Sequence, residues 1–246
     1  NWITWGKYGR RPQLQPEDAF VKKTVDLQEA LSVRHSVFVL GTAGAAKSEL
    51  WKTLAAAQTY LQVGGGKTQF DALNPKSVTS NELYGYVHPV TKEPYDGVIA
   101  KIMRDFAAQS NEQPKWMVLD GDIDAEWIES MNTVMDDNRI LTLANNDRIP
   151  MLRPNCTLLF EVEDLRNASP ATVSRCGMVY VEPSQIGWEP LLTSWLNTLP
   201  EPLEPFKPQL NNLFGCVRLL LITWSRCGPS IIANMQEPRV LSLIHI

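Results

Sequence analysis

A glycine-containing loop lies between an apolar segment and a segment of helical periodicity, and this order most restricts how the chain can fold. Val37–Leu40 is apolar and rich in β-branched residues, as buried strands are. Gly41–Ser48 follows with small residues that end in Lys-Ser, and Glu49–Leu61 then carries apolar residues at helical spacing. A strand, a glycine loop ending in Lys-Ser and a helix form the context of a phosphate-binding loop. The sequence therefore predicts a nucleotide site at Gly41–Ser48.

The residues expected to bind nucleotide belong to this loop and to the first turn of the helix that follows it. Backbone N–H groups at a helix N-terminus point toward a bound phosphate. Lys47 would reach the β- and γ-phosphates, and the Ser48 hydroxyl would coordinate Mg²⁺. The expected ligands are therefore ATP or ADP with Mg²⁺. The full candidate set is Gly41, Thr42, Ala43, Gly44, Ala45, Ala46, Lys47, Ser48 and Glu49.

Ala46 departs from the phosphate-loop pattern, which has glycine directly before the lysine. A methyl group at this position would crowd the phosphate or force a backbone adjustment. The alternative interpretation is an ordinary Gly/Ala turn between a core strand and a helix, without nucleotide.

Composition and charge restrict the class of protein. The 246 residues are 44% hydrophobic and 20% charged, which is enough apolar material for a large buried core. A net charge of −4 gives no support to a nucleic-acid surface. We expect no membrane span, because no apolar run reaches ~18 residues, and we expect an intracellular protein, because no signal-peptide pattern begins the chain. The four cysteines are widely spaced and the three histidines isolated, which favours free thiols over a zinc site.

Strand-like and helix-like segments alternate along the chain, which predicts a mostly parallel sheet covered by helices on both faces. Residues 77–96 are expected to be a loop-rich insertion, and residues 140–151 a hairpin around Asn-Asn-Asp. Gly64–Thr68 resembles the end of a phosphate loop, but it follows a helix, so we interpret it as a turn. The expected strands are 37–40, 68–73, 116–120, 157–162 and 178–181, and the expected helices are 16–31, 49–61, 98–108 and 125–135.

Asp120 follows four apolar residues of a predicted strand, which is the arrangement of a Walker B motif. In parallel α/β sheets, ligands bind beyond the carboxyl ends of the strands, so Asp120 and Gly41–Ser48 would meet there. Asp120 would then hold Mg²⁺. The alternative is that Asp120 caps a helix near Asp124.

The residue after Asp120 is Gly121, where hydrolysing P-loop ATPases of this plan carry a glutamate that activates water. Asp122 and Asp124 follow, and because they lie beyond the end of the strand, the sequence does not tell where their side chains point. We therefore expect a nucleotide that is held for long times and hydrolysed negligibly.

Several segments together resemble the second AAA+ module of a dynein heavy chain motor ring, of the axonemal type. These segments are RHSVFVLGTAGAAKSELWKTL, PKWMVLDGDIDAEWIESMNTVMDDNRILTLANNDRIP and ASPATVSRCGMVYVEP, and the resemblance runs from about Leu14 to Pro200. The segment VEPSQIGWEPLLTSWLNTLP is closer to the inner-arm type. The resemblance implies an α/β P-loop NTPase (AAA+) fold with a partial helical lid, in an ATP-driven, minus-end-directed microtubule motor of the ciliary or flagellar axoneme.

The resemblance also implies roles and partners. The second module binds ATP and hydrolyses it poorly, so this module itself is not expected to be an appreciable ATPase. Arg175 matches the arginine finger that acts on the neighbouring module's nucleotide, although pairing with a nearby carboxylate is the alternative. Glu163 falls near a lost sensor asparagine, and residues 77–97 and 140–151 match loops that meet the linker. The implied partners are neighbouring AAA+ modules and the linker, with intermediate chains, light chains and microtubules bound through the whole motor.

The predicted organisation is a connecting segment (1–16), a large α/β subdomain (17–182), a poorly matched partial lid (183–236) and a non-native tail (237–246). Two other functions stay open. One is a structural AAA+ module that has lost nucleotide, which Ala46 motivates. The other is a self-standing P-loop ATPase, which would need a base and a complete lid.

Overall fold

The computed structural model describes residues 14–109, 111–143, 145–151 and 155–216. The chain divides by compactness into residues 1–190 and 191–246. Most of the predicted connecting segment and all of the predicted non-native tail lie outside the described residues. The predicted domain boundaries stay predictions.

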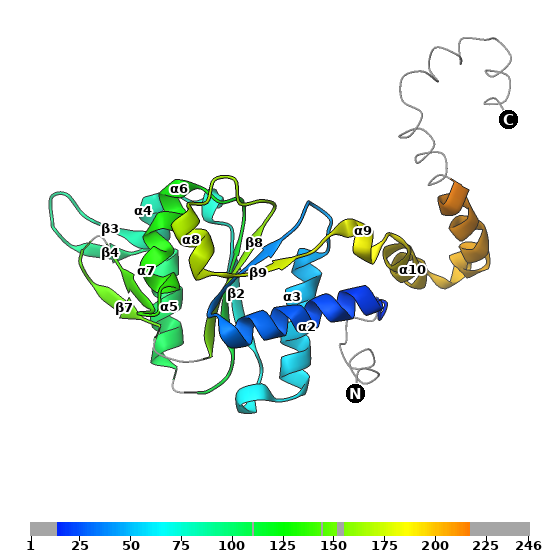
Figure 1. The fold of residues 1–246 in the computed structure, drawn as a ribbon, viewed down its shortest axis with the longest axis horizontal. Coiled ribbons are helices and arrows are strands. Elements are labelled where there is room, and N and C mark those ends of the chain that lie inside the picture. The colour runs from blue at the N-terminus through cyan, green and yellow to red at the C-terminus, as the bar shows by residue number, and fades with distance from the viewer. Residues whose placement is uncertain (1–13, 110, 144, 152–154, 217–246) are drawn as a thin grey trace, which may run out of the picture. The chain divides into compact units, whose positions relative to one another are not determined.

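The first unit is built on a five-stranded sheet in the spatial order β2–β5–β8–β1–β9, and all neighbouring strands are parallel (Figure 1). The predicted mostly parallel α/β sheet is thus confirmed. The Gly64–Thr68 segment overlaps a short 3₁₀ helix, η1 (Val63–Gly65), and leads into a strand instead of a helix. The five strands are β1 (Ser36–Leu40), β2 (Gln69–Leu73), β5 (Lys115–Asp120), β8 (Cys156–Val162) and β9 (Gly177–Tyr180).

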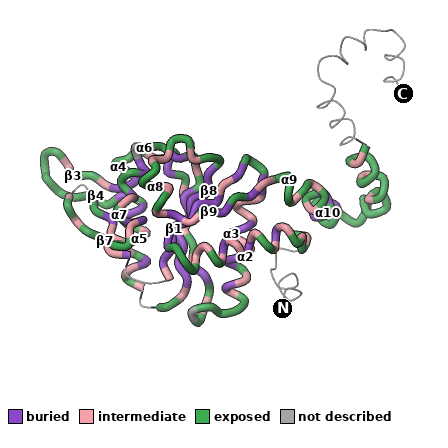
Figure 2. Tube along the Cα trace, in the orientation of Figure 1, coloured by how far each residue is buried: buried purple, intermediate pink, exposed green. Residues whose placement is uncertain are grey.

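The central strands are buried on both faces, which explains their continuous apolar runs (Figure 2). Successive side chains of a strand point to opposite faces. In β1, Val37 and Val39 belong to one core cluster and Phe38 to the other. Leu158 and Phe160 of β8 likewise join Phe38, whereas its Leu159 joins the two valines.

Helices α2 (Asp18–Val33) and α3 (Lys47–Tyr60) provide the cover for one face. Phe20 and Leu27 of α2, and Leu50 and Leu54 of α3, pack with Val39 in one cluster. Both helices therefore confirm the predicted ones, and α3 follows directly from the loop after β1.

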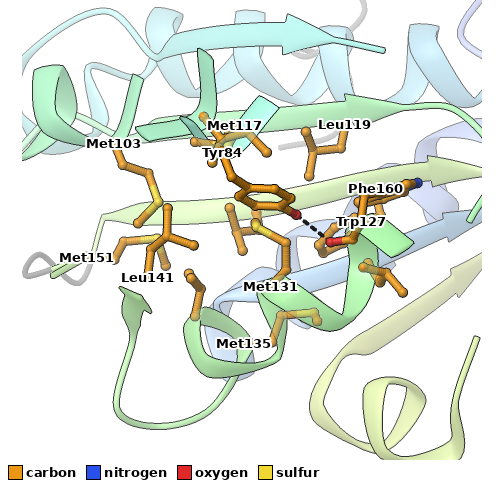
Figure 3. Close-up of a cluster of buried hydrophobic side chains, with 14 of the residues drawn as sticks. Tyr84, Met103, Met117, Leu119, Trp127, Met131, Met135, Leu141, Met151 and Phe160 are labelled. Carbon is orange, nitrogen blue, oxygen red and sulfur yellow. Dashed lines mark hydrogen bonds between the residues drawn. The ribbon is translucent and has the colours of Figure 1, made fainter. Parts of the chain in front are cut away.

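The opposite face carries a methionine-rich cluster beneath α5 (Val98–Ala108) and the segment 125–135 (Figure 3). Tyr84 points into this cluster, and its hydroxyl donates to the Trp127 carbonyl oxygen. Burial raises the pKa of Tyr84, so the hydroxyl keeps its proton. The cluster includes Met103, Met117, Met131, Met135 and Met151.

Two predicted segments differ in detail from the structure. The loop-rich insertion 77–96 follows η2 (Pro75–Ser77), and it contains α4 (Ser80–Tyr84) and the hairpin of β3 (Gly85–Val87) and β4 (Pro94–Asp96). Thr79 and Glu82 form a capping box that begins α4. The predicted helix 125–135 is broken into α6 (Ala125–Ile128), η3 (Glu129–Met131) and α7 (Asn132–Met135).

The predicted second hairpin is confirmed as β6 (Ile140–Thr142) and β7 (Arg148–Pro150). Arg104 of α5 links the two hairpins, because its guanidinium pairs with Asp96 at 2.8 Å and also with Asp147. The hydrogen bond from Arg104 lowers the pKa of Asp147. One charged side chain of α5 therefore contacts both insertions.

After β8 the chain forms α8 (Pro170–Arg175), β9, α9 (Pro183–Ile186) and α10 (Glu189–Asn197), and the division of the chain after Pro190 falls within α10. The second unit contains η4 (Glu201–Phe206), and residues 207–216 are helical. Within it, Trp195 and Phe214 pack edge to face, with ring centroids 5.7 Å apart.

Cys156, Cys176 and Cys216 are free thiols, and Cys227 lies outside the described residues. In the part of the chain that the structure describes, no helix has the length and apolar character that a membrane span requires.

His35, directly before β1, generates a prediction about pH. Its Nε2 donates to the Val134 carbonyl oxygen at 2.9 Å, and burial lowers its pKa below the usual value. The unfolded chain therefore binds a proton more readily than the folded chain, and stability is lost as pH falls below about 6.5. We expect His35→Gln to flatten the fall in unfolding free energy between neutral and mildly acidic pH.

Urea denaturation at a series of pH values measures this effect. His88→Gln, at the less buried β3–β4 hairpin, is the matched control and should keep the wild-type slope. An unchanged slope in His35→Gln would contradict the prediction.

Candidate nucleotide-binding site

The two predicted halves of the site lie at the same edge of the sheet. Gly41–Ser48 follows β1 and Asp120 ends β5, and β8 lies between these two strands. The parallel register brings Asp120 of β5 beside Glu161 of β8, and Glu161 beside Val39 of β1. The phosphate loop and Asp120 are far apart in the sequence, but in the sheet only β8 separates the strands that carry them.

The end of β8 anchors both loops through its backbone. The Gly41 N–H donates to the Val162 carbonyl oxygen at 3.3 Å, and the Gly121 N–H donates to the Glu161 carbonyl oxygen at 3.1 Å. A side chain at Gly41 would not fit, because its Cβ would lie 2.3 Å from the Val181 carbonyl oxygen. The first glycine of the loop is thus required by close backbone packing.

Ala46 adopts a left-handed conformation, with φ 65° and ψ 24°, directly before α3. This conformation costs a non-glycine residue about 1–2 kcal/mol. Alanine therefore holds the backbone conformation that glycine adopts freely in the phosphate-loop pattern, and it stores strain at this point.

Lys47 lies along the loop. Its Nζ donates to the Gly41 carbonyl oxygen at 2.6 Å and to the Thr42 carbonyl oxygen at 3.1 Å. The ammonium group is thus held at the loop by neutral acceptors, for which an anionic phosphate is a stronger replacement.

Ser48 lies in the first turn of α3 and its hydroxyl donates to Glu161 Oε1 at 2.6 Å. Trp51 Nε1 donates to the other carboxylate oxygen of Glu161, Oε2, at 2.9 Å. Glu161 is buried and has no counterpart among the residues predicted for the site. The available signal was a lone acidic residue in the apolar segment TLLFEV.

Asp120 is exposed at the edge of the sheet. Partial desolvation raises its pKa, the negative charge of Glu161 raises it further, and Lys47 and Lys52 oppose both effects. The Asp120 carboxylate and the Ser48 hydroxyl are oxygen donors of the kind that Mg²⁺ prefers, and the negative charge of Glu161 lies beside them. The residues present therefore fit a magnesium ion, which would neutralise the like charges of the pair.

Asp120 does not cap the following helix, because α6 begins only at Ala125. Asp122 forms an exposed pair with Lys76, with 3.6 Å between Nζ and Oδ2. At Gly121 an added Cβ would lie 2.8 Å from Asn74 Oδ1, and this amide oxygen accepts the Lys76 N–H. The position where a hydrolytic glutamate would begin is therefore bordered by the Asn74 side chain.

Arg175 ends α8, and its guanidinium pairs with Asp136 and donates to the Ala171 carbonyl oxygen at 2.7 Å. This is the carboxylate pairing that the sequence left as the alternative to an arginine finger. Its side chain remains 30% exposed. Glu163 is exposed just beyond the end of β8.

The comparisons with known proteins agree with this geometry. The sequence profile of the AAA domain (dynein-related subfamily) matches residues 36–176, more than half of the chain. The ciliary dynein beta chain of Heliocidaris crassispina is 53% identical over 186 residues, which cover 76% of this chain and 4% of that protein.

Two further relatives are similar over more of the chain. Dynein axonemal heavy chain 17 of Mus musculus is 53% identical over 222 residues, covering 88% of this chain and 5% of that protein. The flagellar outer arm dynein beta chain of Chlamydomonas reinhardtii is 49% identical over 200 residues, covering 81% of this chain and 4% of its own length. The chain thus spans only about one twentieth of the length of these ciliary and flagellar relatives.

The dynein resemblance and the predicted AAA fold are confirmed, and the family implies nucleotide binding. The position of the module in the motor ring and the type of dynein arm stay predictions. The loop after β1, the carboxylate that ends β5, the five parallel strands and the matching profile agree: the chain belongs to the dynein-related subfamily of AAA domains.

Proposed function

We propose that this chain is the second AAA+ module of an axonemal dynein heavy chain and that it binds ATP with Mg²⁺ without appreciable hydrolysis. The observation that carries the proposal is the meeting of a P-loop and Asp120 at one sheet edge, with Gly121 next to Asp120 in place of a base. Bound ATP would then act as a regulatory and structural ligand.

Binding uses groups that the fold already directs to this edge. The first backbone N–H groups of α3 have no partner within the helix and suit a phosphate oxygen. Lys47 would exchange its two loop carbonyls for phosphate oxygens, and Ser48 and Asp120 would hold Mg²⁺. When bound, the metal supplies positive charge that offsets the phosphates and the paired carboxylates.

Slow hydrolysis follows from the identity of the residues after Asp120. Gly121 provides no carboxylate, and Asp122 is engaged with Lys76 at the surface. ATP that is bound but not cleaved stabilises the folded chain by mass action.

Arg175 would act on the site of the neighbouring, hydrolysing module. An arginine finger stabilises charge on the transferred phosphoryl group and accelerates turnover about 10³-fold or more. Leaving the Asp136 pair would make the guanidinium available, and its partial exposure supports such a release.

The expected partners are those of a dynein motor. The β3–β4 and β6–β7 hairpins, joined by Arg104, are the segments expected to meet the linker. Neighbouring AAA+ modules would pack around this module, and intermediate chains, light chains and microtubules would be reached through the whole heavy chain in the axoneme.

A nucleotide-free structural module is the second candidate, and the left-handed Ala46 favours it. Its methyl group lies at the point where the phosphate-loop pattern keeps glycine. In that case the fold would be retained for packing in the ring, without a ligand.

A comparison of wild type, Lys47→Ala and Ala46→Gly separates the two candidates. We expect wild type to bind ATP and Lys47→Ala to bind at least about tenfold more weakly, because a charge-assisted contact is lost. Calorimetric titration of nucleotide-stripped chain measures both affinities. Binding by Ala46→Gly together with none by wild type would support the structural module instead.

Turnover supplies a second test. We expect the purified chain to retain ATP, identified by mass spectrometry, and to release negligible phosphate, because Gly121, the residue after Asp120, carries no carboxylate. Asp122→Asn should behave as wild type does. Phosphate release at ordinary ATPase rates that Asp122→Asn abolishes would make Asp122 the base and contradict the proposal.

Arg175 is tested in the full heavy chain. Arg175→Ala should collapse turnover by the neighbouring module and leave ATP binding in this module intact. Arg166→Ala, which removes a more exposed arginine paired with Asp164, is the control and should leave turnover unchanged. Unchanged ATPase activity in Arg175→Ala would refute the finger role.

A further inference from the structure

Glu161 is the only charged residue of β8, a strand whose seven residues are all buried. Its exposed fraction is 7%, and it lies in register between Val39 of β1 and Asp120 of β5. A buried carboxylate lowers stability unless hydrogen bonds replace its water. An apolar residue would be more stable at this position of the strand, so the carboxylate indicates a functional role.

Both carboxylate oxygens of Glu161 accept hydrogen bonds from the first turns of α3, the helix that follows the phosphate loop. Oε1 accepts the Ser48 hydroxyl at 2.6 Å, and Oε2 accepts the Trp51 indole N–H at 2.9 Å. Both donors lie near the start of α3, directly after the loop. The carboxylate therefore fixes the orientation of the residue expected to coordinate the metal.

The direction of the Ser48 hydrogen bond matters for metal binding. A hydroxyl has one proton and two acceptor lone pairs. Because the proton is given to Glu161, both lone pairs of Ser48 Oγ stay available to a cation. The Ser48 hydroxyl proton is donated to Glu161 and not to Asp120, the carboxylate that is predicted to bind the metal.

Asp120 and Glu161 also place two negative charges on neighbouring strands. They form a register pair across β5 and β8, so two acidic side chains end up beside each other at the strand ends. Two carboxylates on paired residues repel each other unless a cation lies near them. A divalent cation on Ser48 and Asp120 would relieve this repulsion.

We propose that Glu161 is a positioning residue of the magnesium site: it orients the Ser48 hydroxyl and thereby sets how strongly Mg²⁺ enhances ATP binding. This inference rests on the proposed nucleotide-binding function. It assigns to Glu161 a role apart from Asp120, whose carboxylate would contact the metal directly.

A purely structural role predicts a different result. If Glu161 only ties α3 to β8, its loss lowers stability and weakens ATP binding equally with and without Mg²⁺. A positioning role changes the ratio of the two affinities instead. In Glu161→Gln only one side-chain oxygen is left to accept, although the Ser48 hydroxyl and the Trp51 N–H both donate to the carboxylate in wild type. When that oxygen accepts from Trp51, the amide nitrogen faces Ser48 and donates to its Oγ, which occupies one of the lone pairs that would bind a cation.

The experiment measures ATP affinity by calorimetry in Mg²⁺ and in excess chelator, on the nucleotide-stripped chain. We expect Glu161→Gln to reduce the Mg²⁺ enhancement about tenfold, as befits one charge-assisted hydrogen bond, with affinity in chelator within about twofold of wild type. Trp51→Phe removes the other donor and leaves the Ser48 bond, so its Mg²⁺ enhancement should match wild type. Glu163→Gln, an exposed carboxylate just beyond the strand, should also match.

A double-mutant cycle with Ser48→Ala shows whether Glu161 acts through Ser48. In the Ser48→Ala background, Glu161→Gln should cause no further loss of Mg²⁺ enhancement. If Glu161→Gln does not fold, Glu161→Asp replaces it: the charge remains, but the shorter side chain does not reach the hydroxyl, and the same loss is expected.

Two outcomes overturn the inference, and they are distinguishable. If wild type binds ATP and both Glu161 variants keep its Mg²⁺ enhancement, Glu161 has only the structural role of holding α3 against β8, while the proposed function stands. If wild type binds no ATP with or without Mg²⁺, the proposed function fails and the inference fails with it.

Discussion

The backbone at the end of β8 holds both halves of the site in place. The Val162 carbonyl accepts the N–H of Gly41, which begins the phosphate loop, and the Glu161 carbonyl accepts the N–H of Gly121, which follows Asp120. Parallel strands pair evenly, so these contacts fix how far each loop extends beyond the sheet. The two faces of β8 are packed by separate core clusters, which immobilise the strand. The nucleotide site thus depends on a strand that carries none of its predicted residues.

The same edge concentrates charge and strain. Ala46 adopts a left-handed conformation, and Asp120 and Glu161 place two carboxylates side by side. Such features lower stability in the absence of a ligand, and they persist because the surrounding core determines the backbone. A magnesium nucleotide would compensate the charges, so the unfavourable arrangement is consistent with a binding site. Gly121 has no side chain, and a Cβ at this position would lie 2.8 Å from Asn74 Oδ1.

Much of the fold was predictable from local pattern. Phe38 and its neighbours form one apolar run because they are buried on both faces, and α5 has the bounds that its periodicity indicated. The misses have local and non-local causes. The capping box of Thr79 and Glu82 was a readable signal for α4. The breaks in the 125–135 segment were not readable, since Trp127, Met131 and Val134 remain buried through a change of helix type that packing imposes.

The sequence by itself determined the phosphate loop, the aspartate that ends an apolar strand and the absence of a glutamate after it, because these are properties of adjacent residues. Only the tertiary structure decided which strand lies between the two motifs, since strand order depends on packing of segments far apart in the chain. That order places Glu161 against Ser48 across 113 residues. It also pairs Arg175 with Asp136, a partner 39 residues earlier. Side-chain partners of this kind are fixed by distance in space, which a linear pattern does not contain.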